Sequence, residues 1–533
     1  MSFDLDADQQ ACADALDGVV IVLAGPGSGK TTVTVKRFKN LIARGVAPED
    51  ILSLTFTNEA AGEMAKRAGV DEVFRTFHSF VLEIMQKERD KLPYELKPAI
   101  LPWEFEDFDL RKKLVQRYPL VRKEDALREY ISTQKREGRS PEEALEAERG
   151  VGEEFARAYR DYEKQSRKEG WLDFDSLMVE AVELLATNQE VRERYAKKYI
   201  QVDEAQDTDQ IQLRLLGLLF RGNIFFVGDD NQAIYEWRGA GSEVTKNIPK
   251  AFPGAKIMYL GTNYRSTGAI VEFIKEITPV DNGLASHMRT DNPYGVRPDF
   301  MHYADDYQEA AHVLKRVTDH PRTAIIARTN RQLFRYQQAC FSAGIKCKIL
   351  GKKAFWEQNE VKQLLSLAKS AKMPASYTAP MILKALVIQH RLLEKYKFSG
   401  NPLDADPADN INSLYKMSAK YATIPEFLDF IRRLTYGSKS NNTPCLTLST
   451  IHQAKGREWD HVFVTGVTEG ILPHSKALHT EEKRGWFVAA SRAAKTLHVT
   501  CYRNPSMFLN DYADRIVKFK PEAVNGVPIQ QGQ

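Results

Sequence analysis

The chain has 533 residues, a length that predicts roughly three or four structural units of about 100–200 residues each. Its hydrophobic, aromatic and charged fractions of 43%, 10% and 27% are typical of a globular protein, and its net charge of +4 does not by itself indicate nucleic-acid binding. The absence of any run of about 18 apolar residues excludes a membrane-spanning helix. With no secretory signal and five cysteines that lack CxxC or zinc spacing, we expect free thiols and a cytoplasmic location.

A glycine-rich segment, IVLAGPGSGKTT, occupies residues 21–32 and overlaps an apolar run over residues 19–23. The run predicts a buried parallel strand, the glycines predict a tight loop, and the residues after them can start a helix. Such a loop cradles nucleotide phosphates with its backbone N–H groups, and the helix N-terminus adds a positive dipole end. Lys30 can reach the β- and γ-phosphates as a point charge, and Thr31 can coordinate the magnesium ion that bridges them. We therefore expect ATP to be bound by Ala24, Gly25, Pro26, Gly27, Ser28, Gly29, Lys30, Thr31 and Thr32, with Ala24 in the place of the usual first glycine.

Two short apolar segments follow, each ending in residues that can contact a nucleic-acid strand. Residues 51–57 predict a second strand that ends at Phe56 and Thr57, and Thr76 and His78 follow a third apolar piece. The carboxyl ends of parallel strands hold ligands, and aromatic and hydroxyl groups bind single strands by stacking and by phosphate hydrogen bonds. The alternative is that Phe56, and Phe77 between Thr76 and His78, belong to the hydrophobic core.

Residues 87–198 are densely charged and show helical spacing of apolar residues, which predicts a helical insertion with a solvated surface. The next strand candidate, YIQVDEAQD at residues 199–207, ends in Asp203 and Glu204. Two carboxylates at the end of a strand suit ATP hydrolysis, because Asp203 would hold magnesium and Glu204 would orient and deprotonate the attacking water. A solvated acidic turn is the alternative interpretation.

A buried strand over residues 224–227 is followed by Gln232, whose amide is suitably placed to sense the γ-phosphate. Tyr235, Trp237 and Arg238 come directly after this residue. Two aromatic rings and an arginine beyond a nucleotide sensor can couple hydrolysis to base stacking, which is worth roughly 1–3 kcal/mol per base. The alternative is that Trp237 lies in the core.

The strand predicted over residues 256–260 leads to Tyr264, which can stack on adenine, and Arg265, a candidate arginine finger. A second α/β pattern starts near residue 322 and is interrupted by a polar helical stretch over residues 373–442.

After this stretch, His452 and Glu458 lie in a turn between two predicted strands, and a helix predicted over residues 481–492 ends at Arg492. The tail from residue 521 is rich in Gly, Pro and Gln and is predicted to be disordered.

Taken together, these segments resemble the UvrD/Rep-like superfamily 1A DNA helicases. LDADQQACA is similar to the glutamine motif of that family, AGPGSGKT to its phosphate loop, LTFTNEAAGEM and TFHSF to its early strand-binding motifs, and VDEAQD to its DExx box. GDDNQAIYEWRGA, NYRST, TIHQAKGREWDHVFV and VAASRA resemble the later motifs, in the same order. The resemblance extends over nearly the whole α/β framework, whereas the two insertions match by place only.

The resemblance implies an α/β fold with two RecA-like P-loop motor domains, each a parallel sheet with flanking helices and a helical insertion. It implies ATP bound between these domains, magnesium-dependent ATP hydrolysis, and 3′→5′ movement on single-stranded DNA with separation of the duplex. By position, Gln9 and Tyr264 would hold adenine and Glu458 the ribose, while magnesium would bind Thr31 and Asp203. The implied catalytic residues are Lys30, Glu204, Gln232, Arg265 and Arg492. The implied DNA-binding residues are Phe56, Thr57, Thr76, His78, Tyr235, Trp237, Arg238 and His452.

The domain boundaries implied in this way divide the chain into two discontinuous motor domains. The first comprises residues 1–86 and 199–262, with residues 87–198 as its insertion. The second comprises residues 263–372 and 443–520, with residues 373–442 as a short insertion, and residues 521–533 form the tail.

Two features of this chain depart from the family pattern and leave alternatives open. Thr32 stands where relatives often carry an arginine, which suggests looser recognition of adenine. The second insertion is shorter than in full-length bacterial members. The alternatives are therefore a compact single-strand translocase, or a nucleotide-sensing ATPase subunit of a larger repair, phage or defence complex, with little unwinding of its own. The expected partners are single-stranded DNA and its junctions with duplex, and a protein could bind through the short insertion or the tail.

Overall fold

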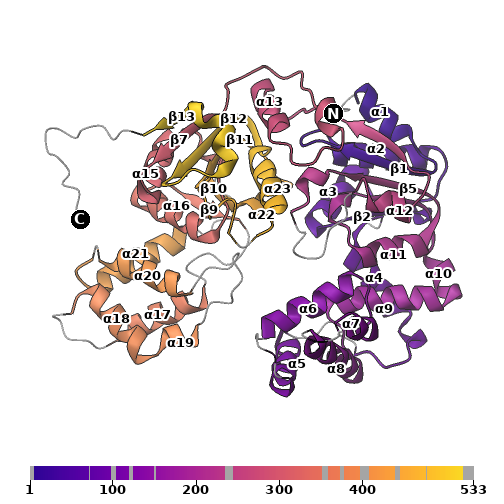
Figure 1. The fold of residues 1–533 in the computed structure, drawn as a ribbon, viewed down its shortest axis with the longest axis horizontal. Helices are drawn as coiled ribbons and strands as arrows, with labels where there is room; N and C mark the ends of the chain where they lie inside the picture. Colours follow the sequence, from indigo (N-terminus) through magenta and orange to yellow (C-terminus); the bar gives the residue numbers. More distant parts are fainter. Residues whose placement is uncertain are drawn as a thin grey trace. The chain divides into compact units, whose positions relative to one another are not determined.

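The computed structural model describes residues 5–70, 73–97, 104–118, 120, 124–148, 150, 152–234, 244–350, 358–371, 377–396, 407–419, 421–437, 445–475 and 477–519. Contacts within the chain divide it into two compact units, and many of their elements are labelled in Figure 1. Unit 1 comprises Met1–Arg265 and Val280–Asp291, and unit 2 comprises Ser266–Pro279 and Asn292–Gln533.

The described strands of unit 1 form one parallel sheet with the order β3-β2-β4-β5-β1-β6. Their bounds are β1 Val19–Ala24, β2 Ile51–Thr55, β3 Phe74–Thr76, β4 Lys197–Val202, β5 Phe220–Gly228 and β6 Lys256–Leu260. Central strands such as β1 and β2 are almost entirely buried, as expected for a parallel sheet covered by helices on both faces. This order places β4, β5 and β1 side by side, so the polar segments after these three strands share one edge of the sheet.

The helices of unit 1 fall into a group that packs on the sheet or on the helices next to it, and a group with its own core. The first group comprises α1 Ala7–Asp14, α2 Lys30–Ala43, α3 Asn58–Ala68, α4 Phe77–Lys87, α9 Phe174–Thr187, α10 Gln189–Tyr195, α11 Gln210–Leu219, α12 Asn247–Ala251 and α14 Leu284–His287. The second comprises α5 Glu104–Arg117, α6 Glu124–Arg136, α7 Pro141–Ala147 and α8 Glu153–Glu169. Leu127, Tyr159 and Trp171 are among the buried residues that form the core of this second group.

The described strands of unit 2 also form one parallel sheet, with the order β13-β7-β12-β11-β8-β10-β9. Their bounds are β7 Asp299–Tyr303, β8 Thr323–Ala327, β9 Cys347–Ile349, β10 Leu446–Thr450, β11 Trp459–Thr465, β12 Ala493–Tyr502 and β13 Ile516–Lys518. The helices packed with this sheet include α13 Gly268–Glu276, α15 Asp306–Arg316, α16 Asn330–Ser342, α22 Ile451–Ala454 and α23 His479–Ala490.

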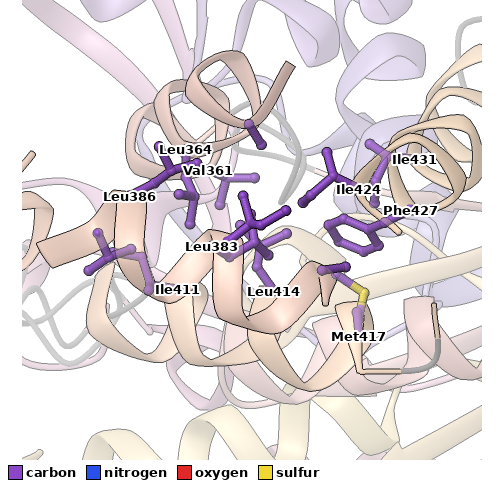
Figure 2. Packing of buried hydrophobic residues seen from close by; sticks show 14 of the residues in the cluster. Val361, Leu364, Leu383, Leu386, Ile411, Leu414, Met417, Ile424, Phe427 and Ile431 are labelled. Atoms are coloured by element: carbon purple, nitrogen blue, oxygen red, sulfur yellow. The ribbon is translucent and has the colours of Figure 1, made fainter. Parts of the chain in front are cut away.

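A second helical group in unit 2 packs around a separate apolar interior. It comprises α17 Asn359–Ser370, α18 Ala379–Gln389, α19 Leu392–Lys395, α20 Pro407–Ser418 and α21 Ile424–Gly437. Figure 2 shows side chains of α17, α18, α20 and α21 meeting there, with Leu383, Leu414 and Phe427 fully buried. The group is therefore a folded part of the protein, with a core of its own.

The predicted fold class, two parallel sheets with flanking helices as in two RecA-like domains, is confirmed by these two sheets. The strand predicted over residues 256–260 has the predicted bounds. The second α/β pattern, predicted to start near residue 322, begins earlier in the structure, with β7 at Asp299–Tyr303. The helix predicted over residues 481–492 ends earlier, at Ala490, because the carbonyl of Arg492 accepts a hydrogen bond from the N–H of Trp459 at 3.0 Å and so joins the pairing of β12 with β11. The predicted domain boundaries stay predictions. Among the described helices, none has the length and hydropathy required to cross a membrane.

Glu309 on α15 is a buried carboxylate in unit 2, and we expect it to make stability depend on pH. It accepts hydrogen bonds from the N–H of Gly466 at 2.9 Å and the hydroxyl of Thr500 at 2.6 Å, but burial raises its pKa to about 7. Because this pKa lies above the value of the unfolded chain, the stabilisation is fully present below about pH 4.5 and is lost as the pH rises through about 7.

Glu309→Gln removes this titration and keeps an oxygen that can accept both hydrogen bonds. Between pH 5 and pH 8, the free energy of unfolding of the variant should therefore rise relative to the native protein, by up to roughly 3 kcal/mol. Chemical denaturation across this range measures the effect, and Glu394→Gln, at an exposed position on α19, is the control. Parallel pH profiles for the Glu309 variant and the native protein would contradict the expectation.

Candidate functional site

The glycine-rich loop lies between β1 and α2 and is built for an anion. Gly29 precedes α2 with a φ of 81°, and no described side chain caps this helix. A side chain at position 29 would be strained at this φ, and its Cβ would lie 2.7 Å from the side-chain nitrogen of Gln9, so glycine is favoured there. The first N–H groups of α2 have no side-chain cap and can donate to phosphate oxygens. Lys30 opens the helix, with its Nζ donating to the carbonyl of Ala24 at 3.3 Å, and Thr31 and Thr32 follow in the first turn.

Residues that follow β6 brace the other side of this loop. The N–H of Gly25 donates to the carbonyl of Leu260 at 3.0 Å, and the N–H of Tyr264 donates to the carbonyl of Gly27 at 3.0 Å. The side chain of Asn263 donates to the carbonyl of Pro26 at 2.8 Å. The structure therefore brings the loop together with Tyr264 and Arg265, which lie far from it in the sequence.

The two residues predicted to hold adenine, Gln9 and Tyr264, both form hydrogen bonds with Asp6. Asp6 and Gln9 form a reciprocal cap at the start of α1, and the Tyr264 hydroxyl donates to the Asp6 carboxylate. The Gln9 amide also donates to the carbonyl of Ser28 at 3.0 Å. Gln9 is buried, whereas Tyr264 is 49% exposed, which leaves its ring accessible for stacking. Asp6 was not predicted as a site residue, although its place before α1 carries the signal of a helix cap.

Asp203 and Glu204 follow β4 at the same edge of the sheet as the loop. Burial raises the pKa of Asp203 to about 7, the charge of Glu204 adds to this shift, and Lys30 opposes it. Glu204 has a φ of 52° and a ψ of 44°, a conformation that costs a non-glycine residue about 1–3 kcal/mol and is found most often at functional sites. This left-handed conformation turns the chain directly after Asp203. The two consecutive carboxylates therefore occupy different positions at the edge of the sheet.

Gln232 lies beyond the end of β5, on the short turn Asp230–Gln232, and is buried. Its side-chain nitrogen donates to the Asp229 carboxylate at 2.7 Å. Burial raises the pKa of Asp229, and the charge of Lys30 again opposes the shift. The structure therefore gathers Lys30, Asp203, Glu204 and Gln232 at the carboxyl edge of three adjacent strands, β1, β4 and β5.

Asp203 fits the role of a magnesium ligand. Its Oδ1 atom is buried and has no hydrogen-bond partner in the described part of the chain, so a hard cation could satisfy it. Within the described residues, no group of three or more His, Cys, Asp or Glu side chains is arranged to hold a metal ion. Magnesium commonly uses one or two carboxylates together with substrate phosphates, and a single aspartate beside a phosphate loop agrees with that pattern.

The predicted DNA-binding residues of unit 1 that the structure describes lie after β2 and β3, and several have structural partners. Thr57 and Thr76 cap α3 and α4, accepting hydrogen bonds from the N–H groups of Ala60 at 3.1 Å and Ser79 at 3.2 Å. The ring of His78 packs edge-on against Phe174. Of the two aromatic residues considered for the core, Phe77 is buried, whereas Phe56 is 36% exposed and accessible to a base. Tyr235, Trp237 and Arg238 lie outside the described residues.

In unit 2, Glu458 and Arg492 precede the adjacent parallel strands β11 and β12, so they share one edge of the second sheet. Arg492 is 2% exposed, and its guanidinium donates to the carbonyls of Val488 at 3.0 Å and Arg457 at 3.2 Å and to the Ser491 hydroxyl at 2.8 Å. These bonds fix its position next to Glu458. His452 lies on α22, after β10.

Two family models together match almost the whole chain. Residues 5–253 match the UvrD/REP helicase N-terminal domain, and residues 258–375 and 383–504 match the UvrD-like helicase C-terminal domain. The chain belongs to the UvrD/Rep helicase family. It is accordingly an ATP-hydrolysing DNA helicase, as the sequence motifs predicted.

Curated relatives of this UvrD/Rep helicase include ATP-dependent DNA helicases named PcrA. The protein of Bacillus subtilis strain 168 is 27% identical, over 95% of this chain and 83% of the relative. The protein of Staphylococcus epidermidis strain ATCC 12228 is 27% identical, over 93% of this chain and 83% of the relative. The protein of Staphylococcus aureus strain Mu50 is 25% identical, over 98% of this chain and 86% of the relative.

Proposed function

We propose that this helicase moves 3′→5′ along single-stranded DNA and separates duplex ahead of it, using magnesium-dependent hydrolysis of ATP. The observation that supports this most directly is the cluster at the carboxyl edge of β1, β4 and β5. The phosphate loop and Lys30 follow β1, the acidic pair Asp203 and Glu204 follows β4, and the amide of Gln232 follows β5.

Each member of the cluster has a proposed role in the reaction. The loop N–H groups and Lys30 bind the β- and γ-phosphates, where positive charge stabilises the transition state. Glu204 accepts a proton from the attacking water, and Gln232 contacts the γ-phosphate. Arg265, and Arg492 from unit 2, supply further positive charge to that phosphate during turnover.

Magnesium, held by Asp203 and the hydroxyl of Thr31, would neutralise the charge that develops on the phosphate oxygens. Gln9 and Tyr264 would hold the adenine, and Glu458 the ribose. The ATP-binding residues proposed for the loop itself are Ala24, Gly25, Pro26, Gly27, Ser28, Gly29, Lys30, Thr31 and Thr32.

The single-stranded DNA is proposed to run past aromatic and hydroxyl side chains, because base stacking holds a strand without regard to its sequence. Phe56, a ring after β2 that is 36% exposed, is proposed to make such a contact. The remaining proposed contacts are Thr57, Thr76, His78, Tyr235, Trp237, Arg238 and His452.

The proposal is tested with purified protein and three DNA substrates: a single strand, a 3′-tailed duplex and a 5′-tailed duplex. We expect single-stranded DNA to stimulate ATP hydrolysis strongly, EDTA to abolish it, and only the 3′-tailed duplex to be separated. Preferential separation of the 5′-tailed duplex would contradict the direction.

Stimulation of ATP hydrolysis without separation of either duplex would favour a translocase with little unwinding. No stimulation at all would favour a nucleotide-sensing subunit. These are the two alternatives that the short helical insertion leaves open.

A further inference from the structure

Gln206 is a buried amide that bridges the ends of two strands. It lies on the turn Ala205–Asp207 after β4 and is 0% exposed. Its side-chain nitrogen donates to a carboxylate oxygen of Glu204 at 2.5 Å. Its side-chain oxygen accepts from the N–H of Asp229 at 3.0 Å, after β5. One amide therefore uses its donor on the carboxylate of Glu204 and its acceptor on the neighbouring strand.

The bridge continues from Asp229 to the predicted phosphate sensor. The Asp229 carboxylate accepts hydrogen bonds from the side chain of Gln232 at 2.7 Å and the N–H of Asn231 at 3.0 Å. Glu204, Gln206, Asp229 and Gln232 thus form one hydrogen-bonded chain across the carboxyl ends of β4 and β5. These strands are adjacent, with Val202 paired to Phe226.

Gly228 provides the space for this bridge. A Cβ at this position would lie 2.6 Å from the side-chain oxygen of Gln206, and 3.1 and 3.2 Å from the backbone nitrogens of Gln206 and Ala205. Backbone atoms cannot move aside as the end of a flexible side chain can. Any larger residue at position 228 would therefore displace Gln206 from its place beside Glu204.

We propose that Gln206 is a positioning residue for ATP hydrolysis, which holds the carboxylate of Glu204 in place and links it through Asp229 to Gln232. This inference rests on the proposed function, because it assigns Gln206 a task only if Glu204 activates water. Glu204 has a strained backbone and begins a turn, so its side chain needs a hydrogen bond from another residue to keep one orientation. A neutral amide can donate that hydrogen bond without adding a charge that would repel magnesium or interact with the phosphates.

Gln201 on β4 supplies a matched comparison. It is also 0% exposed and uses both ends of its amide, accepting from Arg37 at 3.0 Å and donating to Ser53 at 2.7 Å. It lies within the strand, however, and neither of these two bonds reaches Glu204 or Asp229. Loss of Gln201 should reduce stability, whereas loss of Gln206 should reduce the rate of the chemical step.

The test is Gln206→Met, which keeps the volume of the side chain but neither hydrogen bond. With saturating single-stranded DNA, we expect kcat for ATP hydrolysis to fall about ten- to hundredfold, the range for losing a hydrogen bond to a charged group, while KM for ATP changes little. Gly228→Ala should lower kcat in the same way. Gln201→Met should shift the Tm and leave kcat near the native value.

A double variant separates positioning from a general structural effect. If Gln206 acts through Glu204, then adding Gln206→Met to Glu204→Gln should change the residual single-turnover rate by less than about twofold. Equal further losses in the double variant would overturn the inference. It would also be overturned if kcat of the Gln206 variant stayed within about twofold of native while Glu204→Gln was inactive, and the proposed function would then still stand. Normal turnover by Glu204→Gln itself would overturn the role proposed for Glu204 and this inference with it, while the direction of movement and the separation of duplex would still be decided by the tailed substrates.

Discussion

Replacing Glu204 by Gln is expected to lower kcat for ATP hydrolysis by about 10²–10⁴-fold, the usual contribution of a positioned general base, and to leave ATP binding intact. The amide has the same shape as the carboxylate, and its oxygen can still accept the hydrogen bond that Gln206 donates. It cannot take a proton from water. Steady-state hydrolysis with saturating single-stranded DNA gives kcat, and titration with a fluorescent ATP analogue gives Kd.

Glu63→Gln is the matched control, because it makes the same chemical change on an exposed face of α3, where Glu63 pairs with Arg67. Its kcat should equal that of the native protein. Near-native turnover by the Glu204 variant would contradict the role given to this residue. A lost affinity for ATP would show that Glu204 serves binding and not the chemical step.

Replacing Arg492 by Ala is expected to lower kcat by about 10³–10⁵-fold, the range that an arginine finger supplies in phosphoryl transfer. The side chain is buried, and its donors are held by the carbonyls of Val488 and Arg457 and by the Ser491 hydroxyl. A guanidinium fixed in this way acts on a developing negative charge without first having to be ordered. Arg492→Lys keeps the charge but loses the planar fork, so it should restore only part of the rate.

Because Arg492 is buried, its loss could also weaken unit 2, and thermal unfolding of both variants distinguishes this effect from a loss of catalysis. Arg322→Ala is the control: Arg322 is exposed and pairs with Asp460 at 3.3 Å, so its removal should change neither kcat nor Tm substantially. If Arg492→Ala retained native kcat at a native Tm, Arg492 would have no part in hydrolysis.

The local sequence was sufficient to predict most of the strands and the residues that follow them, but not β7 or β13 of the second sheet, whose α/β pattern was predicted to start only near residue 322. Apolar runs such as those of β6 and β8 end at polar residues or glycines, and these signals lie within a few positions of one another. Because parallel strands end at one edge of a sheet, the sequence motifs alone favour a common location for Lys30, Asp203, Glu204 and Gln232. The two parallel sheets confirm the predicted fold class.

Local sequence signals did not predict which side chains hold these residues. Asp6, Gln206 and Asp229 lie within or beside the predicted motifs, but their partners depend on contacts between distant segments. Thr57 and Thr76 were predicted to contact DNA, and the structure shows both as helix caps, a role that does not test the DNA contact. A hydroxyl before a helix suits either role, and the sequence alone does not choose between them.

The sequence by itself therefore determined the order of strands, loops and reactive residues along the chain, because hydrophobic periodicity and turn residues act over a few positions. Only the tertiary structure decided that β4 lies next to β5 and that residues 263–265 brace the phosphate loop. Strand order is set by the packing of the whole sheet and its helices. That packing brings the side chain of Gln206 within hydrogen-bond distance of the N–H of Asp229, while its other end donates to Glu204.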